Sequence, residues 1–89
     1  MTDNIEMHKS ICDELMKLYS QKNHDYGDSF HRTFVEEGFA MSRIRLSDKL
    51  NRFKTLTRKS NGVSHCAVVD ESIRDTLLDL ANYALMTII

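Results

Sequence analysis

Three carboxylates and one amide recur at helical spacing near the end of the chain. Glu71, Asp75, Asp79 and Asn82 stand at i, i+4, i+8 and i+11, which places them on one face of a helix. Carboxylates on consecutive turns repel one another by a few tenths of a kcal/mol for each exposed pair. Solvent, arginines from a neighbouring helix or a divalent cation would each offset that repulsion, and each implies a different function.

A basic segment precedes the acidic one. Residues 39–59 carry seven Lys or Arg against a single acid, Asp48, and Arg45, Asp48 and Arg52 share one helical face. One interpretation is a ladder of ion pairs within the helix, worth about 0.2–0.5 kcal/mol for each pair. The alternative joins Asp48 to the acidic face in an oxygen-rich site of the kind Mg²⁺ prefers, with the basic side chains on phosphates. On this alternative the metal ligands are Asp48, Glu71, Asp75 and Asp79, and the phosphate-binding residues are Arg45, Lys49 and Arg52.

Polar and aromatic residues also gather at 24–30. This segment offers an aromatic ring to stack on a base, a glycine for close backbone approach and polar groups for a sugar or phosphate. The same residues suit a tight turn and a helix cap, with Gly27 supplying a positive φ. We expect residues 23–28 to form a loop. The expected substrate-binding residues here are His24, Asp25 and Tyr26, joined by Asn82 from the acidic face.

The sequence contains no nucleophilic triad, no glycine-rich phosphate loop and no Cys–His motif. If the protein is an enzyme, the expected reaction is therefore metal-assisted hydrolysis with water as the nucleophile. The catalytic residues would then be Asp48, Glu71 and Asp75.

Helices must position all these residues. The chain has no proline and three glycines, which favours long helices that end at glycine. Apolar residues recur at helical spacing in three long segments and one short segment. We predict a single all-α domain over residues 1–89, a bundle of three main helices plus one short helix. The predicted ranges are 4–22, 29–37, 39–59 and 70–88.

Length and composition restrict the partners. A chain of 89 residues buries only about 60% of its unfolded surface, so we expect a homo-oligomer, at least a dimer. The formal net charge of −1 argues against general nucleic-acid binding. No membrane span or signal peptide is visible, and the two cysteines have neither disulfide nor metal-ligand patterns, so we expect a cytoplasmic protein with no membrane partner.

Three segments together carry a family resemblance: 22–30 (KNHDYGDSF), 45–52 (RLSDKLNR) and 70–84. With them, the chain from about residue 15 to 88 resembles the nucleotide modification associated domain 1 family, small proteins largely of bacteriophages and prophages. The resemblance implies a role in nucleotide metabolism, in the cytoplasm of an infected or lysogenic bacterial host.

The order of elements is similar, more distantly, to MazG-type all-α nucleoside triphosphate pyrophosphohydrolases. Those enzymes bind Mg²⁺ between two acidic pairs on neighbouring helices. Glu71, Asp75 and Asn82 match the second acidic helix of that arrangement. The first helix departs from it, because a Glu-x-x-Glu pair is expected there and this chain offers only Asp48 amid basic residues.

Three functions stay open at this stage. The first is Mg²⁺-dependent hydrolysis of a nucleoside triphosphate or a modified one, which would use the carboxylates directly. The second is a non-catalytic protein that sequesters a nucleotide-derived host immune signal, such as a cyclic nucleotide or an ADP-ribose derivative. This second function accounts for the basic helix and the few metal ligands. The third is an interaction module without a small ligand, in which every charge belongs to an ion pair.

Overall fold

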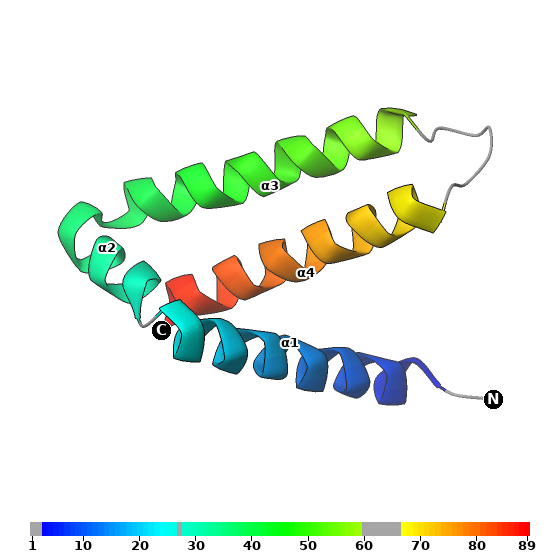
Figure 1. Ribbon diagram of the computed structural model, residues 1–89, viewed down its shortest axis with the longest axis horizontal. Helices are drawn as coiled ribbons and strands as arrows, with labels where there is room; N and C mark the ends of the chain where they lie inside the picture. Colours follow the sequence, from blue (N-terminus) through cyan, green and yellow to red (C-terminus); the bar gives the residue numbers. More distant parts are fainter. Residues whose placement is uncertain (1–2, 27, 60–66) are drawn as a thin grey trace.

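The computed structural model describes residues 3–26, 28–59 and 67–89. Within these residues the chain forms four α-helices and no strand, as Figure 1 shows. The predicted all-α bundle of three long helices and one short helix is therefore confirmed. The helices are α1 (Asn4–Tyr26), α2 (Ser29–Glu37), α3 (Phe39–Lys59) and α4 (Ala67–Ile88).

Helix α4 is the centre of the arrangement. It packs against α3, α1 and α2, and in Figure 1 it lies between α3 and α1. α3 runs antiparallel to α4, whereas α1 runs in the same direction as α4. The short α2 joins α1 to α3 at the end of the bundle where the C-terminus lies. Two long helices thus present side chains to opposite sides of α4.

Two polar contacts set the register of α3 against α4. The Thr87 hydroxyl donates to the Ser42 hydroxyl at 3.0 Å. The Lys49 ammonium lies 3.1 Å from a carboxylate oxygen of Asp79. In this antiparallel register Asp48 of α3 is level with Leu80 of α4.

Interactions between residues close in sequence set several of the helix boundaries. α2 and α3 have the predicted ranges, and Gly38 separates them with φ 71, a backbone conformation that favours glycine. The N–H of Gly38 donates to the carbonyl of Phe34 at 2.7 Å and so completes the end of α2. At the start of α1, the carboxylate of Asp3 accepts from the N–H of Glu6 at 2.9 Å and so caps the helix.

The loop predicted at 23–28 is wrong over residues 23–26, because α1 continues to Tyr26. No glycine or proline occurs before position 27, and adding one residue to an existing helix costs little. For the same reason α4 begins at Ala67, three residues before the predicted start at 70. In both cases the helix is longer than predicted and extends toward the nearest glycine, Gly27 after α1 and Gly62 before α4.

The core between the helices is thin. In the part of the chain that the structure describes, the buried apolar residues are Leu15, Met41 and Leu78, one from each long helix. Aromatic rings attach α2 to the rest of the bundle, with Phe30 5.7 Å from Tyr83 between ring centroids. The main packing is between α3 and α4, and the aromatic contact between α2 and α4 lies close to the candidate site.

One ion pair joins α1 to α4 away from that end. The Arg74 guanidinium donates to both carboxylate oxygens of Glu14, at 2.9 and 2.5 Å. These hydrogen bonds hold the pKa of Glu14 below its ordinary value of 4.5, and the positive charge of Arg74 acts in the same direction. Because the guanidinium contacts both carboxylate oxygens, this pair fixes the orientation of the two side chains more strictly than a single hydrogen bond would.

The pair predicts a pH dependence of stability. A carboxyl group with a lowered pKa stabilises the fold above its ordinary pKa of 4.5, and that contribution is lost as pH falls through the folded-state pKa. We expect the melting temperature of the wild type to exceed that of Glu14→Gln at neutral pH, and the gap to close as the pH falls below that ordinary value. Circular dichroism melts across this range would measure the gap. Glu36→Gln, an exposed change on α2, is the control, and an equal gap for both variants would contradict the prediction.

Candidate functional site

A cavity of about 370 Å³ lies where the end of α1, the start of α2 and the second half of α4 meet. We call it the α1–α2–α4 pocket. Its walls combine aromatic rings, amide and hydroxyl groups, one ammonium group and carboxylates. The lining residues are Tyr19, Lys22, Asn23, Asp28, Ser29, Phe30, Asp79, Asn82, Tyr83 and Met86.

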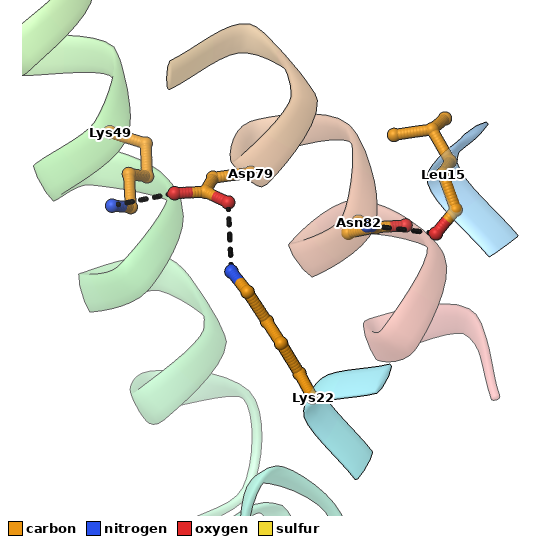
Figure 2. A network of polar contacts seen from close by, with 5 residues as sticks. All are labelled: Leu15, Lys22, Lys49, Asp79 and Asn82. Atoms are coloured by element: carbon orange, nitrogen blue, oxygen red, sulfur yellow. Dashed lines mark hydrogen bonds and ion pairs between the residues drawn. The ribbon is translucent and has the colours of Figure 1, made fainter. Parts of the chain in front are cut away.

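One carboxylate at the wall of this pocket is shared by two lysines. Lys22 of α1 lies 3.2 Å from one oxygen of Asp79, and Lys49 of α3 lies 3.1 Å from the other, as Figure 2 shows. The side chains of Asp79 and Lys49 are 30% and 27% exposed, whereas that of Lys22 is 60% exposed. Three charged groups from three helices thus carry a net charge of +1 beside the pocket.

The lysine network reduces the charge repulsion on one carboxylate of the acidic face of α4, that of Asp79. The repulsion at Asp79 is offset by lysines from both neighbouring helices. Each ammonium group has three N–H donors, and each makes one ion pair with Asp79. The arrangement can therefore hold an anionic group while Asp79 stays ionised.

Asn82 joins the pocket to the contact between α1 and α4. Its side-chain N–H donates to the backbone carbonyl of Leu15 at 3.2 Å (Figure 2). The residue also lines the pocket, as its predicted substrate-binding role requires. The side-chain N–H of Asn82 thus holds α1 against α4. The side-chain carbonyl oxygen of the same residue can accept a hydrogen bond.

The four predicted metal ligands are not gathered at one place in the described structure. Asp79 lies in the lysine network, and Glu71, Asp75 and Asp48 are exposed. Asp48 borders a shallow hollow formed by α3 alone. In the α3–α4 register it lies about five residues from the level of Asp75, roughly 7 Å along the axis, and about nine residues, roughly 13 Å, from that of Glu71.

No group of three or more His, Cys, Asp or Glu suited to a metal ion occurs among residues 3–26, 28–59 and 67–89. The arrangement of the described carboxylates thus does not fit an oxygen-rich Mg²⁺ site. Mg²⁺ binding by Asp48, Glu71, Asp75 and Asp79 stays a prediction.

The predicted substrate-binding residues fall in three groups. Asn82 lines the pocket and Lys49 stands behind Asp79. Arg45 and Arg52 are exposed on α3 and do not line the pocket. The side chains of His24, Asp25 and Tyr26 lie outside the described part of the structure.

Several pocket residues were missed by reasoning from the sequence. Tyr19, Lys22 and Phe30 lie on α1 and α2, and Tyr83 on α4. Lys22 and Phe30 are the two ends of the segment 22–30, which was singled out in the sequence without naming these two residues as binding residues. Tyr19 stands three residues before Lys22, which places it on the same face of α1 once α1 is known to continue.

A known protein family matches most of this chain. The family model described as nucleotide modification associated domain 1 matches residues 22–89. Except for Tyr19, every residue that lines the pocket lies within the matched part. The comparisons with curated proteins and with solved structures gave no match. No helix in the described part of the chain is both long enough and apolar enough to cross a membrane.

Proposed function

The chain belongs to the nucleotide modification associated domain 1 family, and on this premise we propose that it binds a nucleotide or a nucleotide-derived small molecule in the α1–α2–α4 pocket. The observation that carries the proposal is the lysine network with a net charge of +1 at a pocket walled by aromatic rings. Phosphate is the anionic part of such a ligand and a base is its flat apolar part.

The dimensions and the aromatic wall support this class of ligand. Pockets for small molecules have volumes of roughly 300–1,000 Å³, and this one has about 370 Å³. Phe30 and Tyr83 pack against each other at 5.7 Å and both line the pocket, so their faces and edges are held in place. Stacking of a base on such a ring is worth about 1–3 kcal/mol in nucleic-acid complexes.

The lysine network supplies the anion-binding part. Lys22 lines the pocket directly. Lys49 does not line the pocket, but it pairs with Asp79. Because Lys49 neutralises Asp79, the positive charge of Lys22 is left uncompensated within the network. Asp28 also lines the pocket, so the positive charge that a phosphate would meet is local to Lys22, and Asp79 need not be protonated for that contact.

We propose binding without turnover, the role of a protein that sequesters its ligand. Asp79, the carboxylate of the α4 acidic face that lines the pocket, is engaged by two ammonium groups, and Glu71 and Asp75 are exposed. Hydrolysis of a nucleoside triphosphate with Mg²⁺ is the alternative that the experiment must separate from sequestration.

Isothermal titration calorimetry with a panel of deoxynucleoside triphosphates, cyclic nucleotides and ADP-ribose tests the proposal, with Mg²⁺ and with EDTA. We expect saturable binding of at least one ligand in both buffers, and chromatography should recover that ligand intact. Phosphate or pyrophosphate release that requires Mg²⁺ would instead establish hydrolysis. Absence of binding across the panel at millimolar concentration would favour the interaction module.

The Asp79→Asn variant distinguishes an ion-pair role from a metal-ligand role. Losing this carboxylate raises the net charge of the network to +2, so we expect phosphate-bearing ligands to bind roughly fourfold more tightly, since a charge about 5 Å away in water is worth about 0.8 kcal/mol. The melting temperature should fall, because two ammonium groups lose their shared partner. Asp13→Asn, which removes an exposed partner of Lys9 on α1, is the matched control. If Asp79 were a metal ligand, the variant would lose affinity in Mg²⁺ and gain nothing in EDTA.

A further inference from the structure

A second, almost wholly apolar groove lies beside the pocket, between α1 and the end of α4. Its volume is about 360 Å³. The side chains of α1 that line it include Cys12, Met16 and Tyr19, and those of α4 include Leu85 and Ile88, followed by the terminal Ile89. We call this surface the α1–α4 groove. Met16 is 65% exposed and Ile88 is 81% exposed, so the groove is open to solvent in the single chain.

The first half of α1 extends the same surface. Every residue from 3 to 13 is exposed, including Ile5 at 81%. Ile5, Cys12, Met16 and Tyr19 recur at i, i+7, i+11 and i+14, which makes one stripe that runs into the groove. A helix without tertiary packing is marginal below about 12–15 residues, so this half of α1 needs a surface to pack against.

The chain as a whole also exposes more area than a compact monomer of its mass. The chain exposes 7097 Å², whereas a folded monomer of 10.3 kDa is expected to expose about 5,400 Å². Its radius of gyration is 15.0 Å, against about 12 Å for a compact domain of this length. The excess of about 1,700 Å² is twice the roughly 800 Å² that each partner buries in a standard protein interface.

We infer that a second copy of this chain covers the α1–α4 groove, so that the protein is a homodimer through α1 and the end of α4. The groove offers almost no polar group to a differently charged partner, and an isologous contact places the same apolar surface on both sides. The exposed area is sufficient for that contact, and a core with three buried apolar residues in the described structure needs it.

The dimer also borders the pocket. Tyr19, Asn82 and Met86 line both the α1–α4 groove and the α1–α2–α4 pocket. A second copy in the groove therefore closes one side of the pocket, and ligand binding and association should strengthen each other. This consequence rests on the proposed function, whereas the dimer itself does not.

Sedimentation velocity on the full chain from 1 to 100 µM tests the dimer. We expect a mass of about twice 10.3 kDa for the wild type, and the monomer mass for Met16→Glu and Leu85→Glu, which place a charge in the groove. Val35→Glu and Ile44→Glu are matched controls, because these residues are 71% and 61% exposed on α2 and α3, away from the groove. A wild-type monomer at 100 µM would overturn the inference, as would loss of the dimer in the control variants alone.

A second measurement decides the case in which the groove variants do not fold. For the wild type, the melting temperature of a dimer rises with protein concentration. Labelling of the exposed thiol of Cys12 by a bulky maleimide, in a Cys66→Ser background, should slow as the concentration rises, because Cys12 lines the covered groove. A melting temperature and a labelling rate that are both independent of concentration would overturn the inference.

Discussion

The double variant Lys22→Ala, Lys49→Ala is expected to bind its nucleotide ligand at least about 100-fold more weakly than the wild type. Losing the Lys22 contact costs about 1.5–3 kcal/mol if it hydrogen-bonds a charged phosphate. The network charge also changes from +1 to −1, because Asp79 then stands without either lysine. Every 1.4 kcal/mol is a factor of ten in affinity, so the two effects together account for the expected loss.

Isothermal titration calorimetry on a series of variants would measure the effect of this charge. The network carries +2 in Asp79→Asn, +1 in the wild type, 0 in each single lysine variant and −1 in the double variant. Affinity should fall in that order. Lys17→Ala, Lys54→Ala is the matched double control, since it removes one exposed lysine from α1 and one from α3 outside the pocket. A control that loses as much affinity as the test variant would show that only overall charge matters.

Leu78→Ala is expected to lower the free energy of unfolding by about 2–5 kcal/mol, the range for truncating a buried leucine. Leu78 is 8% exposed and is one of the three buried apolar residues of the described core, on the helix that contacts every other helix. A small domain has a total stability of only about 5–15 kcal/mol, so this loss leaves a substantial unfolded fraction.

Urea titration followed by circular dichroism would measure this loss, at one fixed protein concentration so that association contributes equally. Leu50→Ala is the matched control, because Leu50 is 43% exposed on α3 and loses the same atoms on truncation. We expect a cost below about 1 kcal/mol for the control, since surface substitutions change stability little. Similar costs for the two variants would mean that α4 is not the packing centre of the fold.

The sequence by itself determined the helical class and the boundaries of α2 and α3. These depend on interactions within a few residues, namely apolar periodicity and a glycine at position 38 that ends one helix before the next begins. The same local reasoning failed at the end of α1. Residue types typical of turns over 23–26 indicated a loop, whereas the growing helix continued to Tyr26 because nothing before Gly27 interrupts its hydrogen bonds.

The sequence also showed that Glu71, Asp75 and Asp79 share a helical face, since that follows from the 3.6-residue period alone. It did not show what lies opposite each carboxylate. Lys22 reaches Asp79 across 57 positions of sequence, and Arg74 reaches Glu14 across 60. Contacts between residues so far apart in the sequence depend on how α1 packs on α4. The spacing of residues within one helix cannot reveal them.

The tertiary structure alone decided which basic residues of α3 stand near the pocket. Arg45, Lys49 and Arg52 lie within two turns of one another and were equivalent candidates by charge. The register set by the Ser42–Thr87 hydrogen bond turns Lys49 toward α4 and leaves Arg45 and Arg52 exposed. Arg45 and Arg52 lie only about 40° and 60° from Lys49 around the helix axis, so the spacing of the three residues alone could not show which of them contacts α4.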